Sequence, residues 1–267
     1  MKIQSKVFYK SFFISLLIFA LVAGIIISSL YMDSVAVEPT KRESNILLGL
    51  SHSGKLISLM VMNCNPQNNS ISFLPIPDNT ILENGEILQD QYSTVRINKL
   101  RVAVEGLIGT RINRFIIFST EALSSITNEV GKFEYLIPYK FVYENYEHSG
   151  PSYMNGELSL AMFTYSGYDM TKVSISEIAS SYLYSFLLKH ANPTSATKIS
   201  DAINSADIKK MIQTNMSDNE VIQYCNFLAN YSNLSQKNIG IEGTSHLTSS
   251  KLYFTPNRYN LDKNIFK

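Results

Sequence analysis

The strongest constraint in this chain is an uncharged apolar segment near its beginning. Residues 11–32 read SFFISLLIFALVAGIIISSLYM and contain no Asp, Glu, Lys or Arg. At a rise of about 1.5 Å per residue, a helix of this length crosses the bilayer hydrocarbon core, which is about 30 Å thick. Such a helix satisfies its own backbone hydrogen bonds in lipid. The sequence therefore predicts a transmembrane anchor at residues 11–32.

The flanking charges predict the orientation of this anchor. The charged residues before it are all basic: Lys2, Lys6 and Lys10. Asp33 follows it directly, and the next basic residue is Lys41. Because basic residues concentrate on the cytoplasmic side of a membrane, residues 1–10 are expected in the cytoplasm and the C-terminal domain outside it. We therefore predict a single-pass protein of the cell membrane.

A cleaved signal peptide is the alternative to an anchor. Small residues at 34–36 (SVA) would suit a cleavage site. The apolar part of a signal peptide is usually about 7–15 residues long, and this segment is longer. An uncleaved anchor is therefore favoured.

The remaining residues, about 230, are enough for one domain with a substantial core. The formal net charge of +1 and the lack of a basic run argue against a nucleic-acid partner. Cys64 and Cys225 are too few for a disulfide scaffold or a zinc site, and both lie in apolar patterns that favour buried free thiols over one bridge. The four histidines lack metal-ligand spacing, so zinc is not expected.

Strands and helices are expected to alternate in the first half of the domain. The apolar patterns predict strands at 56–63, 70–76, 112–118 and 133–137, and helices at 95–108 and 119–130. Turn residues fill 65–69, Gly109 and Gly131 would end the two helices, and 77–94 is expected to be irregular. This order predicts an α/β or mixed α+β domain with a central mixed sheet flanked by helices.

The second half is expected to be more helical. Ser174 with Glu177, and Ser217 with Glu220, match the capping box that opens a helix. The two helices would bury one stripe each: Ala179, Tyr182, Leu183, Phe186 and Leu187, and then Val221, Ile222, Cys225, Leu228 and Ala229. A last strand is expected at 249–254. The predicted layout is a cytoplasmic N-terminus at 1–10, the anchor at 11–32, a tether at 33–44 and one extracytoplasmic domain at 45–267.

The order of these segments resembles the LytR-CpsA-Psr (LCP) family of bacterial envelope proteins, from residue 45 to about residue 256. Residues 45–49 (NILLG) look like the opening strand of the family, and 59–66 (LMVMNCNP) with 71–80 (ISFLPIPDNT) look like its second strand, turn and "SIPRDT" loop. Residues 96–98 (RIN) are similar to "KIN", and residues 109–131 match the "LLGIPIDYYVEV…ALGGV" stretch. Residues 154–157 (MNGE) are similar to "LNGEQALAYVR".

This resemblance implies an anchored α/β domain and a phosphotransferase that moves glycopolymers from a polyprenyl pyrophosphate lipid to peptidoglycan. Such chemistry requires arginines and magnesium on the pyrophosphate and an apolar pocket for the lipid chain. The sequence departs from the family at these positions. The metal-binding Asp of "RSDS" falls on Ile57, the Arg-Asp pair of "SIPRDT" on Asp78 and Asn79, and the Asp of "IDYY" on Asn113. The two arginines of "YVRxR" fall on Thr164 and Ser166. The arginine-rich start of the next helix is replaced by Lys172, Ser174, Ser176 and Ala179.

These departures favour a catalytically degenerate binding or scaffolding module of the Gram-positive cell envelope. The alternative is a divergent transferase. The remaining candidate substrate-binding residues are Lys55, Arg96, Asp169 and Lys172, and Arg101, Arg111 and Arg114 are expected to be solvated. No metal site or cofactor is expected, with Mg²⁺ required only by the transferase alternative. The expected partners are membrane lipid through the anchor, and a polyprenyl-linked glycopolymer or another envelope protein.

Overall fold

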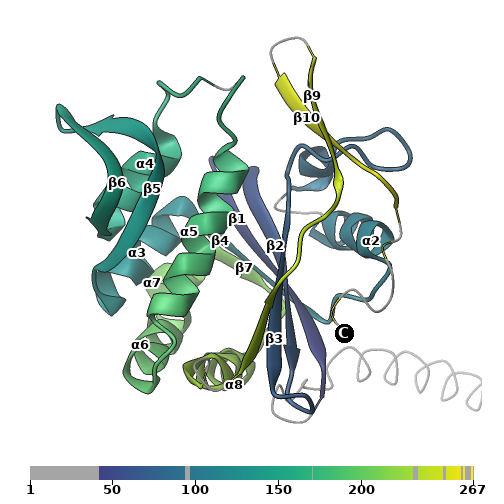
Figure 1. The fold of residues 1–267 in the computed structure, drawn as a ribbon. Helices are drawn as coiled ribbons and strands as arrows, with labels where there is room; N and C mark the ends of the chain where they lie inside the picture. The colour runs from purple at the N-terminus through teal and green to yellow at the C-terminus, as the bar shows by residue number, and fades with distance from the viewer. Residues whose placement is uncertain are drawn as a thin grey trace, which may run out of the picture. The chain divides into compact units, whose positions relative to one another are not determined.

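A computed structural model of the chain describes residues 42–93, 97–169, 171–230, 234–248, 251–259, 261 and 266 (Figure 1). The described residues belong to one compact unit. The predicted anchor at 11–32 lies outside them and stays a prediction. Within the described part, no helix combines the length and apolar character that a membrane crossing requires.

The centre of the domain is a six-stranded sheet with the strand order β7-β4-β1-β2-β3-β8. Its strands are β1 (Ser44–His52), β2 (Lys55–Asn65), β3 (Ser70–Ile76), β4 (Arg114–Ser119), β7 (Ile212–Thr214) and β8 (Ser235–Asn238). β1 pairs antiparallel with β2 and parallel with β4, while β3 pairs antiparallel with β2 and parallel with β8. The predicted mixed sheet is confirmed.

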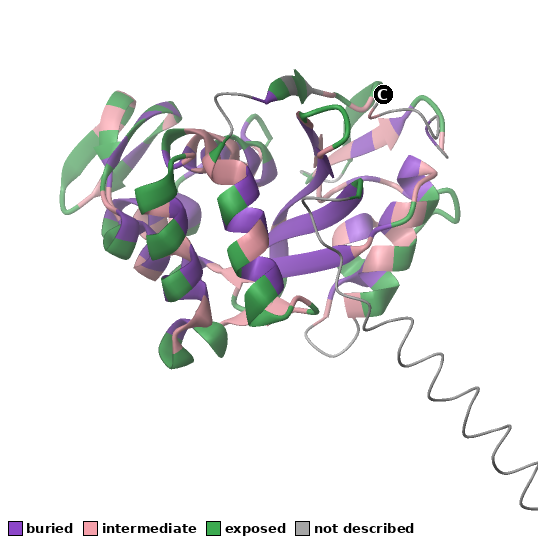
Figure 2. Cartoon of the chain, turned by 90° about the horizontal axis from the view of Figure 1, so that it is seen from below, coloured by how far each residue is buried: buried purple, intermediate pink, exposed green. Residues whose placement is uncertain are grey.

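The central strands are apolar at nearly every position because helices and loops cover both faces of the sheet (Figure 2). Alternate residues of one strand join different core clusters: Ile46 and Leu48 face one side, and Leu47 faces the other. The tight connection between β1 and β2 uses Ser53 and Gly54 at φ values of 50° and 77°. Glycine adopts this backbone conformation without strain.

Helices cover the two faces unequally (Figure 1). α2 (Ile97–Ile108) packs with the short η1 (Leu88–Gln91) on one face. The opposite face carries α3 (Thr120–Val130), α4 (Gly156–Thr164), α5 (Ile175–Lys189), α6 (Pro193–Asn204), α7 (Ala206–Lys209) and α8 (Asp218–Ala229). The core on this face is the larger of the two clusters.

Two hairpins lie outside the central sheet. β5 (Phe133–Tyr143) pairs with β6 (Tyr146–Met154), and β9 (Gly243–Thr248) pairs with β10 (Lys251–Pro256). The strand predicted at 133–137 is therefore present but longer, and it joins a separate two-stranded sheet. Its alternating buried and exposed residues explain the difference, since only one face of this hairpin meets the core. The last strand predicted at 249–254 corresponds to β10, which begins at Lys251 and continues to Pro256, while residues 249 and 250 lie outside the described residues.

The helix caps follow the sequence closely. Ser119 accepts a hydrogen bond from the Ala122 amide at the start of α3. Ser217 and Glu220 form the predicted capping box of α8 in full, whereas for Ser174 the structure gives the bond from the Glu177 amide alone. The caps therefore set where these helices begin.

The buried stripe of α8 corrects one expectation. Val221 and Cys225 are buried as predicted, but Ile222 is 39% exposed, and Tyr224 and Phe227 take the inner positions instead. The sequence places an apolar residue at each of these positions, so the pattern alone could not fix the rotation of the helix. Cys64 and Cys225 are both buried free thiols, as expected.

Candidate functional site

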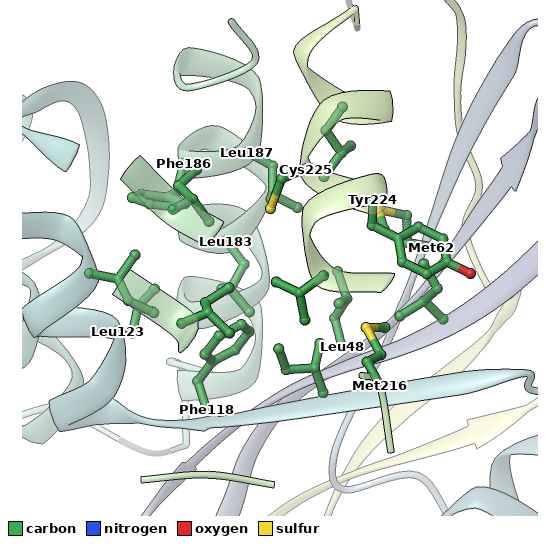
Figure 3. Close-up of a pocket in the computed structure, with 17 residues that line it drawn as sticks. Leu48, Met62, Phe118, Leu123, Leu183, Phe186, Leu187, Met216, Tyr224 and Cys225 are labelled. Atoms are coloured by element: carbon green, nitrogen blue, oxygen red, sulfur yellow. The ribbon is translucent and has the colours of Figure 1, made fainter. Parts of the chain in front are cut away.

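An apolar cavity lies between the central sheet and the helices of the larger layer (Figure 3). Seventeen residues line it, from β1, β2 and β4 beneath, from α3, α5, α6 and α8 around, and from Met216 just before α8. Its volume is about 80 Å³, which is smaller than the volumes of about 300–1,000 Å³ that are common for ligand pockets. Leu187 of α5 and Leu228 of α8 are half-buried, so solvent reaches part of the lining.

None of the lining residues carries a charge, and the few polar atoms are not available to a ligand. The Tyr224 hydroxyl donates a hydrogen bond of 3.1 Å to Ser44 Oγ. Burial raises the pKa of the Cys225 thiol to about 12, so the sulfur stays a neutral thiol. The cavity therefore suits a hydrocarbon chain rather than a polar molecule.

A second, polar pocket lies at the beginning of α5. Its volume is about 250 Å³, and its polar side chains are Asn79, Ser174, Ser176, Glu177, Ser180 and Ser245. Prolines and residues of the C-terminal hairpin form its apolar wall: Pro75, Pro77, Leu252 and Phe254. The β10 strand is held there because the Asn79 amide donates to the Leu252 carbonyl at 2.8 Å.

Asp78 is the acidic residue beside this pocket. Its backbone amide donates to Ser176 Oγ at 3.3 Å, which ties the loop after β3 to the first turn of α5. Burial raises the pKa of the Asp78 carboxyl to about 6, although hydrogen bonds from the Asn79 and Asp78 amides and from Ser176 act in the opposite direction. At neutral pH this carboxyl is therefore mainly ionised, but its anion is less stable than that of a solvent-exposed aspartate.

One helix connects the two compartments. The first half of α5 supplies Ser176 and Ser180 to the polar pocket, and its second half supplies Leu183 and Leu187 to the apolar cavity. Between them, Ser180 Oγ shares a hydrogen bond of 2.8 Å with Ser58 Oγ of β2, with both residues buried. Tyr184 packs edge-on against Phe73 of β3, with ring centroids 5.2 Å apart. These contacts fix α5 to the sheet.

The structure does not gather the predicted substrate-binding residues into either compartment. Lys55 is exposed at the start of β2. Asp169 and Lys172 are exposed and pair with each other at 3.2 Å in the loop before α5. Arg96 lies outside the described residues. None of the three described residues lines the cavity or the polar pocket.

The positions that depart from the family pattern have structural roles. Ile57 is half-buried and packs against the main core. Asn113 accepts a 2.8 Å hydrogen bond from the Asn45 amide through its Oδ1, which joins β1 to the residue before β4. In the described part of the chain, no three His, Cys, Asp or Glu side chains lie close enough together to hold a metal ion.

Sequence reasoning missed one buried charge. Arg114 was expected to be solvated, but its side chain is 9% exposed, and its Nε donates to Glu220 Oε1 at 2.8 Å. Burial raises the pKa of Glu220, but hydrogen bonds from Ser217 and Arg114 outweigh this effect and hold it below its usual value. The apolar residues that follow Arg114 in β4 could have indicated its burial, because they place the backbone of Arg114 in a buried strand.

No protein-family model matches the sequence, and no curated protein matches it significantly. Solved structures do match. TagV of B. subtilis is 18% identical with a TM-score of 0.66, over 85% of this chain and 95% of that one. A putative transcription regulator from Eubacterium siraeum DSM 15702 is 17% identical with a TM-score of 0.63, over 85% of this chain and 89% of that one.

TagT bound to LI-WTA is 14% identical with a TM-score of 0.63. The match covers 83% of this chain and 87% of TagT. TagV and TagT are LCP proteins. At these low identities the likeness shows the fold alone, and the described domain has an LCP-like fold.

Proposed function

We propose that this protein is a membrane-anchored, extracytoplasmic module of the bacterial cell envelope that binds a polyprenyl-linked glycopolymer without transferring it. The apolar cavity between the sheet, α5 and α8 carries this proposal. A lining without charge suits a polyprenyl chain because burying hydrocarbon gains about 25 cal/mol per Å² of surface removed from water. The solved complex of TagT with wall teichoic acid supports a glycopolymer as the cargo.

The charge of the polar pocket is the reason for proposing that the protein does not transfer the glycopolymer. Pyrophosphate binding needs concentrated positive charge, which bidentate arginines and a metal ion supply in other phosphate sites. The pocket at the start of α5 instead has Glu177 in its lining and Asp78 beside it, and no Lys or Arg among its lining residues. Two carboxyl groups at this place oppose a pyrophosphate rather than hold it.

The anchor predicted at 11–32 completes the proposal. A polyprenyl chain is buried in the bilayer, so a domain that captures one must be held close to the membrane surface. An anchor with a cytoplasmic N-terminus would hold the domain on the outer side, where we place the protein. Another envelope protein is the remaining candidate partner.

The chain contains no tryptophan, so one introduced indole can report on the cavity. Phe118→Trp places it in the lining at a half-buried position, where the extra volume has space. The full-length protein in lipid nanodiscs would be titrated with polyprenyl phosphate brominated along its chain. We expect concentration-dependent quenching of the indole, because bromine quenches only on close approach.

Tyr153→Trp is the matched control, since Tyr153 is 73% exposed on β6 and does not line the cavity. Its fluorescence should respond only to brominated lipid in the surrounding bilayer, as both variants share that background. Equal quenching of the two indoles would exclude binding of the chain in the cavity.

A genetic measurement separates the binding module from the transferase alternative. We expect Arg96→Ala to leave glycopolymer attachment in cells unchanged, because the proposed module performs no phosphoryl transfer. If attachment is abolished while the protein remains folded and abundant, the enzyme reading replaces this proposal.

A further inference from the structure

The β5–β6 hairpin has an apolar outer face that is exposed to solvent. The hairpin lies at the outer edge of the larger helix layer, on the far side of the molecule from α2 (Figure 1). Leu136 and Val142 of β5 are 67% and 39% exposed, and Tyr153 of β6 is 73% exposed. Paired residues of antiparallel strands share a face, so Leu136 lies beside Pro151 and next to the pair of Glu134 with Tyr153. Contiguous exposed apolar surface of this kind marks an interaction site.

The packing of the hairpin itself does not require these side chains. The alternate residues of β5, Tyr135, Ile137 and Phe141, are buried in the main core. An antiparallel strand with one buried face ordinarily carries polar residues on the other face. β5 and β6 instead carry leucine, valine, tyrosine and prolines there, so the outer face has apolar surface that the fold does not use.

The free edge of β6 is less suited to a partner than the outer face. Among the described strands β6 pairs with β5 alone, and an unpaired edge can accept an extended segment as a further strand. Pro151 of β6 lacks a backbone N–H, and Gly150 beside it has a φ value of 68°, so the edge is interrupted. A partner is therefore expected on the face.

The charges of the hairpin favour a basic partner. β5, β6 and the turn between them carry Glu134, Glu144 and Glu147 but only one basic residue, Lys140. Lys140 is paired with Glu147 at 2.8 Å, so these two charges offset each other. Glu134 and Glu144 are exposed and have no ion pair among the described residues. Two carboxylates thus flank the apolar surface, near the start of β5 and in the turn after it, and attract positive charge.

We propose that the outer face of the β5–β6 hairpin binds a basic amphipathic segment of another envelope protein. Apolar side chains of that segment would cover Leu136, Val142 and Tyr153, and its lysines or arginines would meet Glu134 and Glu144. A cation can also lie over the ring of Tyr153. The proposal goes beyond the lipid function above and does not depend on it, since the hairpin contributes no residue to the cavity lining.

Methyl NMR can test this proposal on the full-length protein in nanodiscs of zwitterionic lipid. The probe is an amphipathic peptide of leucine and lysine, and we expect saturable shifts of the Leu136 and Val142 methyl signals. Val102 on α2 and Leu247 on β9 are 60% and 55% exposed, so their signals serve as internal controls and should not shift. A matched peptide with glutamate in place of lysine should bind at least about tenfold more weakly, because the two carboxylates repel it.

Two substitutions separate the apolar contribution from the charge. Leu136→Ala should weaken binding of the lysine peptide at least about fivefold, read from the Val142 signal, because a central apolar contact is lost. Glu134→Gln should bring the affinities of the two peptides at least about threefold closer together. Glu83→Gln is the matched control, since Glu83 is exposed in the loop after β3, and it should change neither affinity.

Three results would each overturn the proposal: no shift at Leu136 and Val142, equal affinity for the two peptides, or equal shifts at Leu247. If the hairpin signals shift when anionic lipid replaces zwitterionic lipid without peptide, the face contacts the bilayer and the assigned partner is wrong. The quenching of Phe118→Trp measures lipid binding separately, so the failure of either proposal leaves the other standing.

Discussion

Ser58 of β2 and Ser180 of α5 share a hydrogen bond of 2.8 Å between their hydroxyl oxygens, although 122 positions separate them in the chain. The pair lies where the polar half of α5 gives way to its apolar half. It fixes the helix to the sheet between the two compartments of the site.

We expect Ser58→Ala and Ser180→Ala each to lower the free energy of unfolding by about 1–2 kcal/mol, because each leaves a buried hydroxyl without its partner. The double substitution removes both groups, so its cost should be smaller than the sum of the single costs. Urea denaturation of the four proteins gives the coupling energy. Strict additivity would mean that the two hydroxyls do not depend on each other.

Glu220→Ala should destabilise the domain by about 3–5 kcal/mol, because it leaves the buried Arg114 guanidinium without its carboxylate and also removes part of the α8 capping box. Glu147→Ala provides the comparison, since its pair with Lys140 is exposed, is screened by solvent and should contribute little to stability. Thermal denaturation of both variants ranks the pairs. A similar loss of stability in Glu220→Ala and Glu147→Ala would show that the buried ion pair stabilises the fold no more than the exposed pair.

The Asp78 carboxyl should make stability depend on pH. Its pKa in the folded protein is about 6, above the ordinary value of 3.8, so the folded state binds a proton more tightly than the unfolded state. Stability should therefore fall as the pH rises from about 4 to about 6, by up to about 3 kcal/mol, and then change no further through this group. Asp78→Asn should remove this component. Urea denaturation at several pH values tests it, and an unchanged profile in the variant would contradict it.

Two glycines should respond to alanine in opposite directions. A Cβ at Gly156, at the start of α4, would collide with the Ser124 carbonyl oxygen and the Asn128 side chain. Gly156→Ala should therefore lower the melting temperature by several degrees. Gly106 lies within α2 with open space around it, so Gly106→Ala should stabilise the protein by about 0.5–1 kcal/mol. Calorimetry of both variants checks the contrast, which would be wrong if both change in the same direction.

Local patterns predicted five strands and four helices of the fold, but not the strands β6, β7, β8 and β9 or the helices α4, α6 and α7. The strand at Ser70–Ile76 has the bounds that the apolar run and the preceding turn residues indicate, and α3 begins after Ser119 because this serine caps its first turn. These signals depend on neighbours a few residues apart. The apolar pattern gave the wrong buried face where several apolar residues could each face the core, as for Ile222 on α8.

The candidate site was less predictable. The sequence located departures at Ile57 and Asp78, but it did not show what replaces the missing groups. Only the folded chain brings Asp78 to Ser176 of α5, 98 positions away, and opens a pocket beside them. Lys55, Asp169 and Lys172 are charged residues that remain near the motifs of the family, and closeness to a motif in the sequence gives no information on which side chains converge.

The sequence by itself determined an uncharged segment long enough to span a membrane, the alternation of strands and helices, the caps, and the resemblance to the LCP proteins. These properties follow from hydrophobic periodicity and from hydrogen bonds within one turn of backbone. Tertiary structure decided the pairing of strands, the burial of Arg114 against Glu220 and the cavity beneath α5 and α8. All three features depend on side chains that meet only when distant segments pack. The free energy of these contacts therefore cannot be read from any one segment of the sequence.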